Sequence, residues 1–190
     1  MNHIRMNVYG VSIEHPVDWQ IYINSQNRFS FNEGLIKIDK VDGGKKNQIS
    51  LSIRWAKMKK DINLEDYIEE LEKQFRKKEK KSRHKDSYKI MDKKRWMIDG
   101  NEAYFLHNQF QANHNVYRFL GKEELVETLQ IVYYSKETKR MIIGTLLTTP
   151  EELRNRKSEL MNILSSLKED IQSDIEHLKK GQDSSQIKVI

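Results

Sequence analysis

The sequence contains no cysteine, only two prolines and no long apolar run. The missing cysteines exclude disulfides, thiol nucleophiles and zinc sites built from thiolates. No apolar stretch approaches the roughly 18 residues that a membrane-spanning helix needs. The first ten residues also lack the apolar segment of a secretion signal. If Met1 is the native start, we therefore expect a cytoplasmic protein without a transmembrane segment.

The sequence does contain enough apolar and aromatic residues for a folded core. Of the 190 residues, 37% are hydrophobic and 33% are charged, and the aromatic residues include 3 Trp, 8 Tyr and 6 Phe. A disordered chain of this charge would carry fewer aromatic residues. The length suits one domain. We expect a single α+β domain over residues 1–172, followed by a polar tail over 173–190.

Alternation of apolar and polar residues predicts many short strands. The clearest is 47–58, in which Ile49, Leu51, Ile53 and Trp55 alternate with polar residues. Further strands are expected at 8–16, 21–23, 29–31, 35–41, 88–99, 102–112, 116–120, 125–134 and 141–148. Turns are expected at 24–27, 42–44, 99–101 and 136–139, where glycine, asparagine and charged residues gather.

Two segments have the spacing of helices. One apolar stripe comprises Leu64, Tyr67, Ile68, Leu71 and Phe75, which fall on one helical face behind the candidate N-cap Asn63. The other helix follows the capping residues Thr149, Pro150 and Glu152. Its expected stripe is Leu153, Leu160, Ile163, Leu164, Leu167 and Ile171. The order of strands, helix, strands and helix predicts an antiparallel sheet flanked by helices, an α+β fold.

Several short segments in this order resemble the PsbP-like α/β/α sandwich superfamily over about residues 8–170. They are the Pro-x-x-Trp segment at 15–19, the helix start at 63–67, the strand turn at 99–104, the helix entry at 148–150 and the helix end at 164–167. The resemblance implies a binding or assembly protein. Superfamily members include extrinsic photosystem proteins, a Ran-binding nuclear factor, bacterial lipoproteins, DcrB/LpqN-like proteins and Eag-type chaperones of secretion effectors. It transfers no ligand site, because the basic segment described below is not part of the shared pattern.

No catalytic or cofactor motif is recognisable. Phosphate-binding loops, dinucleotide fingerprints and nucleophile elbows are absent from the sequence. The adjacent glutamates at 69–70, 123–124 and 151–152 are interpreted as surface pairs, because acid–base catalysis needs two carboxyl groups that converge in one cleft. His107 is interpreted as a polar or sheet-face residue, since a metal site would also need a carboxylate beside it. We therefore expect a protein that is not an enzyme and holds no cofactor or metal.

The charge distribution is the one feature that stands out. The net charge is +6, but residues 73–95 alone hold twelve Lys or Arg against three acids, so the rest of the chain is net acidic. Such a local cluster suits an anionic partner: nucleic acid, an acidic protein or a membrane surface. It also suits an exposed helix end where lysine is soluble. The candidate contact residues are Lys73, Arg76, Lys77, Lys80, Lys81, Arg83, Lys93, Lys94 and Arg95.

The sequence leaves the partner open. Tyr88, Trp96 and His84 lie among the cations and are placed to stack on bases, which favours single-stranded nucleic acid. Lysine outnumbers arginine nine to three in this segment, which weakens that reading because arginine makes the bidentate contacts. We therefore predict a binding, assembly or chaperone-like protein that acts through its sheet face or this basic edge on a protein partner or a second copy. Nucleic acid remains the alternative partner.

Overall fold

Seven antiparallel strands form the main sheet of the protein. The computed structural model describes residues 2–23, 29–40, 49–81, 87–111 and 125–170. The sheet has the order β3-β4-β5-β9-β8-β7-β6. These strands are Trp19–Ile23 (β3), Glu33–Lys40 (β4), Ile49–Lys57 (β5), Ser87–Ile98 (β6), Asn101–Gln111 (β7), Leu125–Ser135 (β8) and Arg140–Thr148 (β9). The predicted antiparallel α+β fold is therefore confirmed.

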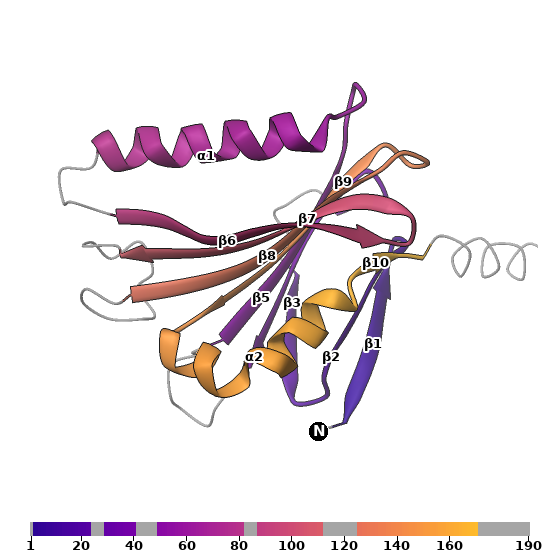
Figure 1. Cartoon of the computed structure of the whole chain (residues 1–190). Coiled ribbons are helices and arrows are strands. Elements are labelled where there is room, and N and C mark those ends of the chain that lie inside the picture. Colours follow the sequence, from indigo (N-terminus) through magenta and orange to yellow (C-terminus); the bar gives the residue numbers. More distant parts are fainter. Residues whose placement is uncertain (1, 24–28, 41–48, 82–86, 112–124, 171–190) are drawn as a thin grey trace, which may run out of the picture.

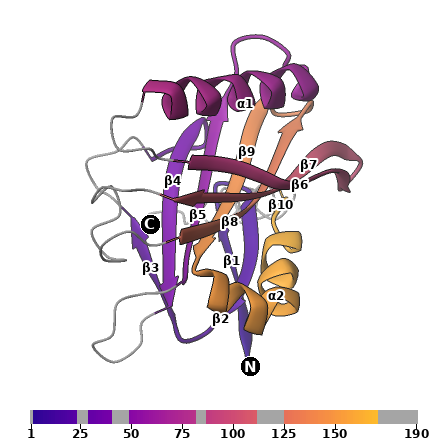
Figure 2. The same ribbon diagram turned by 60° about the vertical axis from the view of Figure 1, so that its left-hand side comes forward.

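Helices lie on both faces of this sheet (Figures 1 and 2). The helix α1 (Leu64–Lys81) covers one face near β6 and β7, and its Leu64 and Ile68 pack on Tyr104 and Leu106. The helix α2 (Pro150–Ser165) packs on the other face against β8 and β9. The strands β7, β8 and β9 contribute alternate residues to two cores, one on each face of the sheet, which is why their apolar alternation in the sequence is only partial. The buried apolar residues of β4 and β5 belong to the core under α2 alone.

A second, three-stranded sheet was not foreseen. The predicted strand at 8–16 begins too early: the strand is Val11–Pro16 (β2), and it pairs as a hairpin with His3–Val8 (β1), which the sequence did not predict. The turn between them is Tyr9–Gly10, where φ is 50° and 72°. Two successive residues with positive φ form a tight two-residue hairpin turn, and glycine adopts this conformation at no steric cost.

The last helix ends earlier than its apolar stripe predicts. Helix α2 stops at Ser165, Ser166 caps it, and Leu167 is buried beyond the helix. The chain then forms the short strand β10 (Lys168–Glu169), which pairs with β2 and completes the order β1-β2-β10. The prediction that the helical stripe includes Leu167 is therefore wrong, because this leucine reaches the core from the turn after the helix, where its N–H donates to the Leu164 carbonyl at 3.1 Å. Ile171 lies outside the described residues.

The predicted short strand at 29–31 is also wrong. Ser30 and Glu33 instead form a local turn, in which the Ser30 backbone N–H donates to the Glu33 carbonyl at 2.8 Å. The Ser30 carbonyl accepts a hydrogen bond from the Trp55 indole at 2.9 Å. Phe29 packs edge-on against the ring of Trp55. The two aromatic residues here form no strand: Phe29 packs on Trp55, whereas Phe31 lies beneath the Arg140 guanidinium.

A fully buried arginine joins the two sheets. Arg140, at the start of β9, donates from Nε to Glu169 of β10 at 2.6 Å. Its Nη1 donates to the backbone carbonyls of Tyr9 at 2.7 Å and Phe31 at 3.0 Å. The guanidinium also lies 4.1 Å above the centre of the Phe31 ring. One side chain thus connects the β1–β2 turn, the entry to β4, β9 and β10.

Other predictions agree with the structure or fall outside it. The strands predicted at 47–58, 88–99, 102–112, 125–134 and 141–148 match β5 to β9 with shifts of one or two residues at their ends. The predicted turns at 24–27 and 42–44 and the strand at 116–120 lie outside the described residues, as does the tail at 173–190. Within the described parts of the chain, neither helix could cross a membrane.

Candidate binding surface on the first helix and the β6 edge

The basic segment is divided between two elements. Lys73, Arg76, Lys77, Lys80 and Lys81 belong to the second half of α1, whereas Lys93, Lys94 and Arg95 belong to β6. Arg83 lies outside the described residues. The structure therefore brings the predicted cations to one edge of the sheet, but on separate surfaces.

Helix α1 begins where the sequence predicts. The Asn63 side chain accepts hydrogen bonds from the backbone N–H groups of Glu65 at 2.9 Å and Asp66 at 3.4 Å, which makes it the N-cap. The first half of the helix holds five acids and no cation. The second half holds six cations and one acid. This polarity matches the helix dipole, which favours acids at the N-terminus and cations at the C-terminus.

Four of the cations on α1 form a row on its outer face. Lys73, Arg76, Lys77 and Lys80 are spaced i, i+3, i+4 and i+7, so they share one side of the helix, and all four are exposed. Lys73 lies 3.9 Å from Glu69. Among the described residues, the other three cations of the row form no ion pair. We call these four residues the outer basic row.

The cations of β6 point alternately to the two faces of the sheet. Lys93 and Arg95 lie on the α1 face, where they pair with Glu72 at 3.0 Å and Glu65 at 2.8 Å. Lys94 lies on the opposite face and pairs with Asp92 at 2.8 Å. Hydrogen bonding to Lys94 lowers the pKa of Asp92. Three of the four β6 cations are thus paired locally, and two of these pairs connect α1 to the sheet.

Aromatic rings fill the space between the two elements. Tyr88 of β6 stacks on Phe75 of α1 with ring centres 4.0 Å apart, and it lies nearly parallel to Phe110 at 6.2 Å. Burial, with a smaller contribution from the charge of Glu72, raises the pKa of Tyr88 above its usual range. Since Phe75 stacks on one face of the Tyr88 ring, this face is not available for the base stacking that the sequence suggested.

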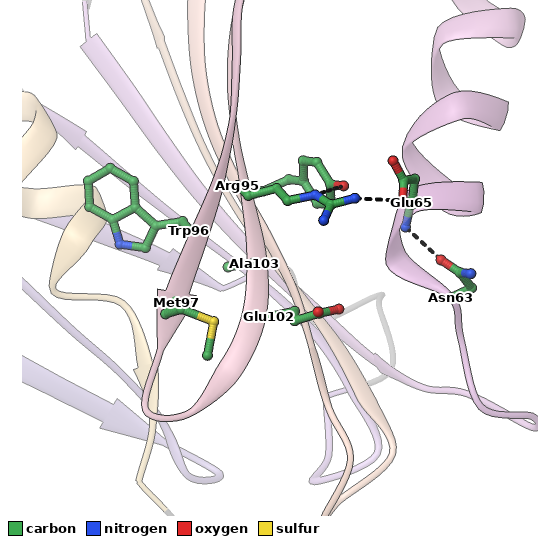
Figure 3. Close-up of a pocket in the computed structure, with 8 residues that line it drawn as sticks. Asn63, Glu65, Arg95, Trp96, Met97, Glu102 and Ala103 are labelled. Atoms are coloured by element: carbon green, nitrogen blue, oxygen red, sulfur yellow. Dashed lines mark hydrogen bonds and ion pairs between the residues drawn. The ribbon is translucent and has the colours of Figure 1, made fainter.

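A pocket of about 610 Å³ lies where the start of α1 meets the β6–β7 hairpin (Figure 3). Glu65, Glu102 and Arg95 supply its charges, and Tyr104 accepts a hydrogen bond from Arg95 Nε at 3.1 Å. The hydrogen bonds that Arg95 donates to Tyr104 and Glu65 raise its pKa. Trp96 projects to the other side of the hairpin (Figure 3). Two carboxylates and one guanidinium leave this pocket with one net negative charge, so it does not add to the attraction for an anion.

Sequence reasoning missed a polar cluster on the opposite face of the sheet. His107 Nε2 lies 2.5 Å from Glu127, and the Gln109 side chain donates to the same carboxylate at 2.6 Å. Glu127 is buried. The pairing of β7 with β8 brings these residues together. They are far apart in the sequence, so no local pattern predicted the contact. Across the described ranges, no three metal-ligating side chains gather at one point.

Comparison with known proteins identifies the fold. No family model matches the sequence, and no curated protein matches it. Among solved structures, the cyanobacterial PsbP protein CyanoP from Synechocystis sp. PCC 6803 has a TM-score of 0.63 at 14% identity, over 88% of this chain and 92% of that chain. This chain has the PsbP-like fold. A mutant of the protein Mog1 is similar at a TM-score of 0.54 and 9% identity, over 91% and 98% of the two chains.

A third solved structure similar to this chain is a protein of unknown function, PA94 from Pseudomonas aeruginosa, described as a putative regulator. It has a TM-score of 0.53 and 17% identity, over 88% of this chain and 97% of that chain. The resemblance inferred from the sequence is therefore confirmed for the fold. At these identities the likeness extends to the arrangement of the elements and not to any site.

Proposed function

We propose that this protein is a non-enzymatic binding or assembly protein that holds an acidic partner on the outer basic row of α1. The supporting observation is the placement of four exposed cations on one helical face. Three of these, Lys73, Arg76 and Lys77, lie before the last helical turn, where the helix dipole has lost most of its influence. The helix dipole therefore explains the cations in the last turn of α1 better than it explains the outer basic row.

An acidic protein surface suits the row better than nucleic acid does. Arg76 is the single arginine among the four, Arg95 is already paired with Glu65, and one face of Tyr88 is covered by Phe75. Base recognition relies on arginine forks and free aromatic faces. A lysine-rich row provides attraction without bidentate contacts. Nucleic acid stays the second candidate partner.

Two expectations from the sequence stay predictions: the cytoplasmic location and the single domain over residues 1–172.

The test compares two variants that lose the same charge. In the first, Lys73, Arg76, Lys77 and Lys80 are all changed to Gln. In the control, the exposed Lys59, Lys60, Arg154 and Lys157 are changed to Gln. Fluorescence anisotropy measures the binding of a labelled poly-glutamate peptide and of a single-stranded oligonucleotide over a range of salt concentrations.

We expect the outer-row variant to lose at least about tenfold in affinity for the acidic peptide at low salt, and the control to keep most of it. The wild-type affinity should fall steeply with salt. Equal losses in the two variants would show that net charge alone acts and would refute the proposal. Tighter, row-dependent binding of the oligonucleotide would favour the second candidate.

A further inference from the structure

Within the described ranges, the strand β3 (Trp19–Ile23) is an edge strand of the main sheet. Its one neighbour among the described strands is β4, and the pairing between them is regular along all five residues. The strand contains no charge and no proline. Ile21, Tyr22 and Ile23 are 42%, 45% and 50% exposed. Proteins normally protect such an edge with charges, prolines or bulges.

The opposite edge, β6, shows the usual protection. It has a register shift between Ile90 and Asp92, and it carries Lys89, Asp92, Lys93, Lys94 and Arg95. Helix α1 also lies against it. The protein therefore blocks one edge of its sheet and leaves the other chemically suited to further pairing.

We propose that β3 pairs antiparallel with β3 of a second copy of this chain, so that two sheets join across a two-fold axis. Full overlap of the five residues places Ile21 opposite the partner's Ile21 and Gln20 opposite the partner's Tyr22. Such a contact is isologous, because each surface meets its own equivalent. The inference does not rest on the proposed acidic partner.

The side chains of β3 complement their own copy on both faces of the sheet. Ile21 and Ile23 project on one face, so the paired strands place apolar groups together across the axis. On the other face the Tyr22 hydroxyl donates to the Gln20 side chain at 2.7 Å within one chain. In the paired strands, Tyr22 of each copy lies opposite Gln20 of the other copy, so the same two side chains come together twice across the axis. Neither strand introduces a charge into the contact.

The charge distribution also favours a second copy at this edge. The outer basic row lies beside β6, and six strand spacings of about 4.8 Å separate β3 from β6, roughly 29 Å in all. This exceeds the Debye length of about 8–10 Å near physiological salt. Pairing through β3 therefore joins two copies of a basic chain and keeps their cation rows at opposite ends of the joined sheet.

The first experiment adds a charge at the proposed axis. Ile21→Lys places two lysines face to face, whereas the control Met97→Lys adds one to the β6 edge, where Met97 is 59% exposed. Sedimentation equilibrium over a range of protein concentrations should give a dimer for the wild type and for Met97→Lys. The dimer dissociation constant of Ile21→Lys should rise by at least about tenfold. A wild type that stays monomeric, or equal effects of the two changes, would overturn the proposal.

The second experiment tests the register and does not depend on the lysine variant folding. The chain has no cysteine, so each introduced one is unique. Opposed residues of antiparallel strands have Cα atoms about 4.5–5.5 Å apart, which a disulfide can span. Mild oxidation should cross-link Ile21→Cys efficiently and Ile23→Cys poorly, because Ile23 lies opposite the partner's Trp19. Equal cross-linking of the two variants, or none in Ile21→Cys, contradicts this register.

Discussion

Gly34 is a position where a single neighbouring side chain, Trp55, requires a glycine. It begins the buried part of β4, directly opposite Trp55 of β5. A Cβ atom added at Gly34 would lie 2.1 Å from the Trp55 ring. That ring is buried and is held in place by its hydrogen bond to Ser30 and by Phe29. The glycine therefore provides space for the tryptophan.

We predict that Gly34→Ala lowers the free energy of unfolding by about 1–3 kcal/mol, the usual cost of overpacking a core. Gly144→Ala is the matched control, because there the added atom would meet the flexible end of Leu167 at 2.7 Å. Its cost should be smaller than that of Gly34→Ala. Urea denaturation measures both values, and the reverse order would contradict the packing argument.

Arg140 is the second residue whose role only its contacts reveal. We predict that Arg140→Met lowers the free energy of unfolding by about 3–5 kcal/mol, because it leaves Glu169 buried without its cation. Adding Glu169→Gln to this variant should recover part of the loss. The exposed neighbour Lys139→Met serves as the control and should change stability by less than about 1 kcal/mol. Strictly additive single and double variants in urea denaturation would rule out direct coupling.

At the scale of elements, α2 is stabilised by charges as well as by its cap. The Thr149 hydroxyl accepts a hydrogen bond from the Glu152 N–H at 3.2 Å. The helix is interrupted at Arg156, which has φ −128° and ψ 19°. The Arg156 guanidinium donates to both oxygens of Glu159, at 2.8 and 2.6 Å. These bonds lower the pKa of Glu159.

This lowered pKa makes the stability of α2 depend on pH in a definite direction. The folded state binds the Glu159 proton less readily than the unfolded state, so the stabilisation is present above the unfolded carboxyl pKa. It is lost as pH falls through the lower, folded value. We predict that the melting temperature of the wild type exceeds that of Glu159→Gln near neutral pH and that this difference disappears in acid. A difference that stays constant down to about pH 2 would contradict the ion-pair explanation.

Helix α1 shows how the same charges serve two purposes. Its acidic residues Glu65 and Glu72 face β6 and pair with Arg95 and Lys93, so these cations add to the apolar packing that holds the helix on the sheet. The cations of the outer basic row point away from the sheet. A variant designed to weaken partner binding should therefore change the outer row and leave the β6 cations intact, since loss of the latter would also loosen α1.

At the scale of the whole molecule, the two edges of the main sheet have different properties. The β6 edge carries the basic segment and the first helix, and the β3 edge carries neither charge nor cover among the described residues. The proposed acidic partner and the proposed second copy therefore occupy opposite ends of one sheet. Each can be tested without disturbing the other.

The sequence by itself determined the elements whose signals are local. Alternation along β5 and β7, the helical spacing of Leu64–Phe75, and the caps Asn63 and Thr149 depend on neighbouring residues and were predicted correctly. Because these elements occur in a recognisable order, the PsbP-like fold was also predictable. Boundaries were less accurate where a turn formed through two residues of positive φ, as at Tyr9–Gly10.

The tertiary structure decided which charges are available and which are already paired. Twelve cations in one segment look alike in sequence, but pairing with Glu65, Glu72 and Asp92 separates the β6 cations from the outer row. The same holds for Arg140 with Glu169 and for His107 with Glu127, whose partners lie 29 and 20 residues away. Electrostatic interactions depend on distance in space, and the sheet register that sets those distances arises only when the whole chain has folded.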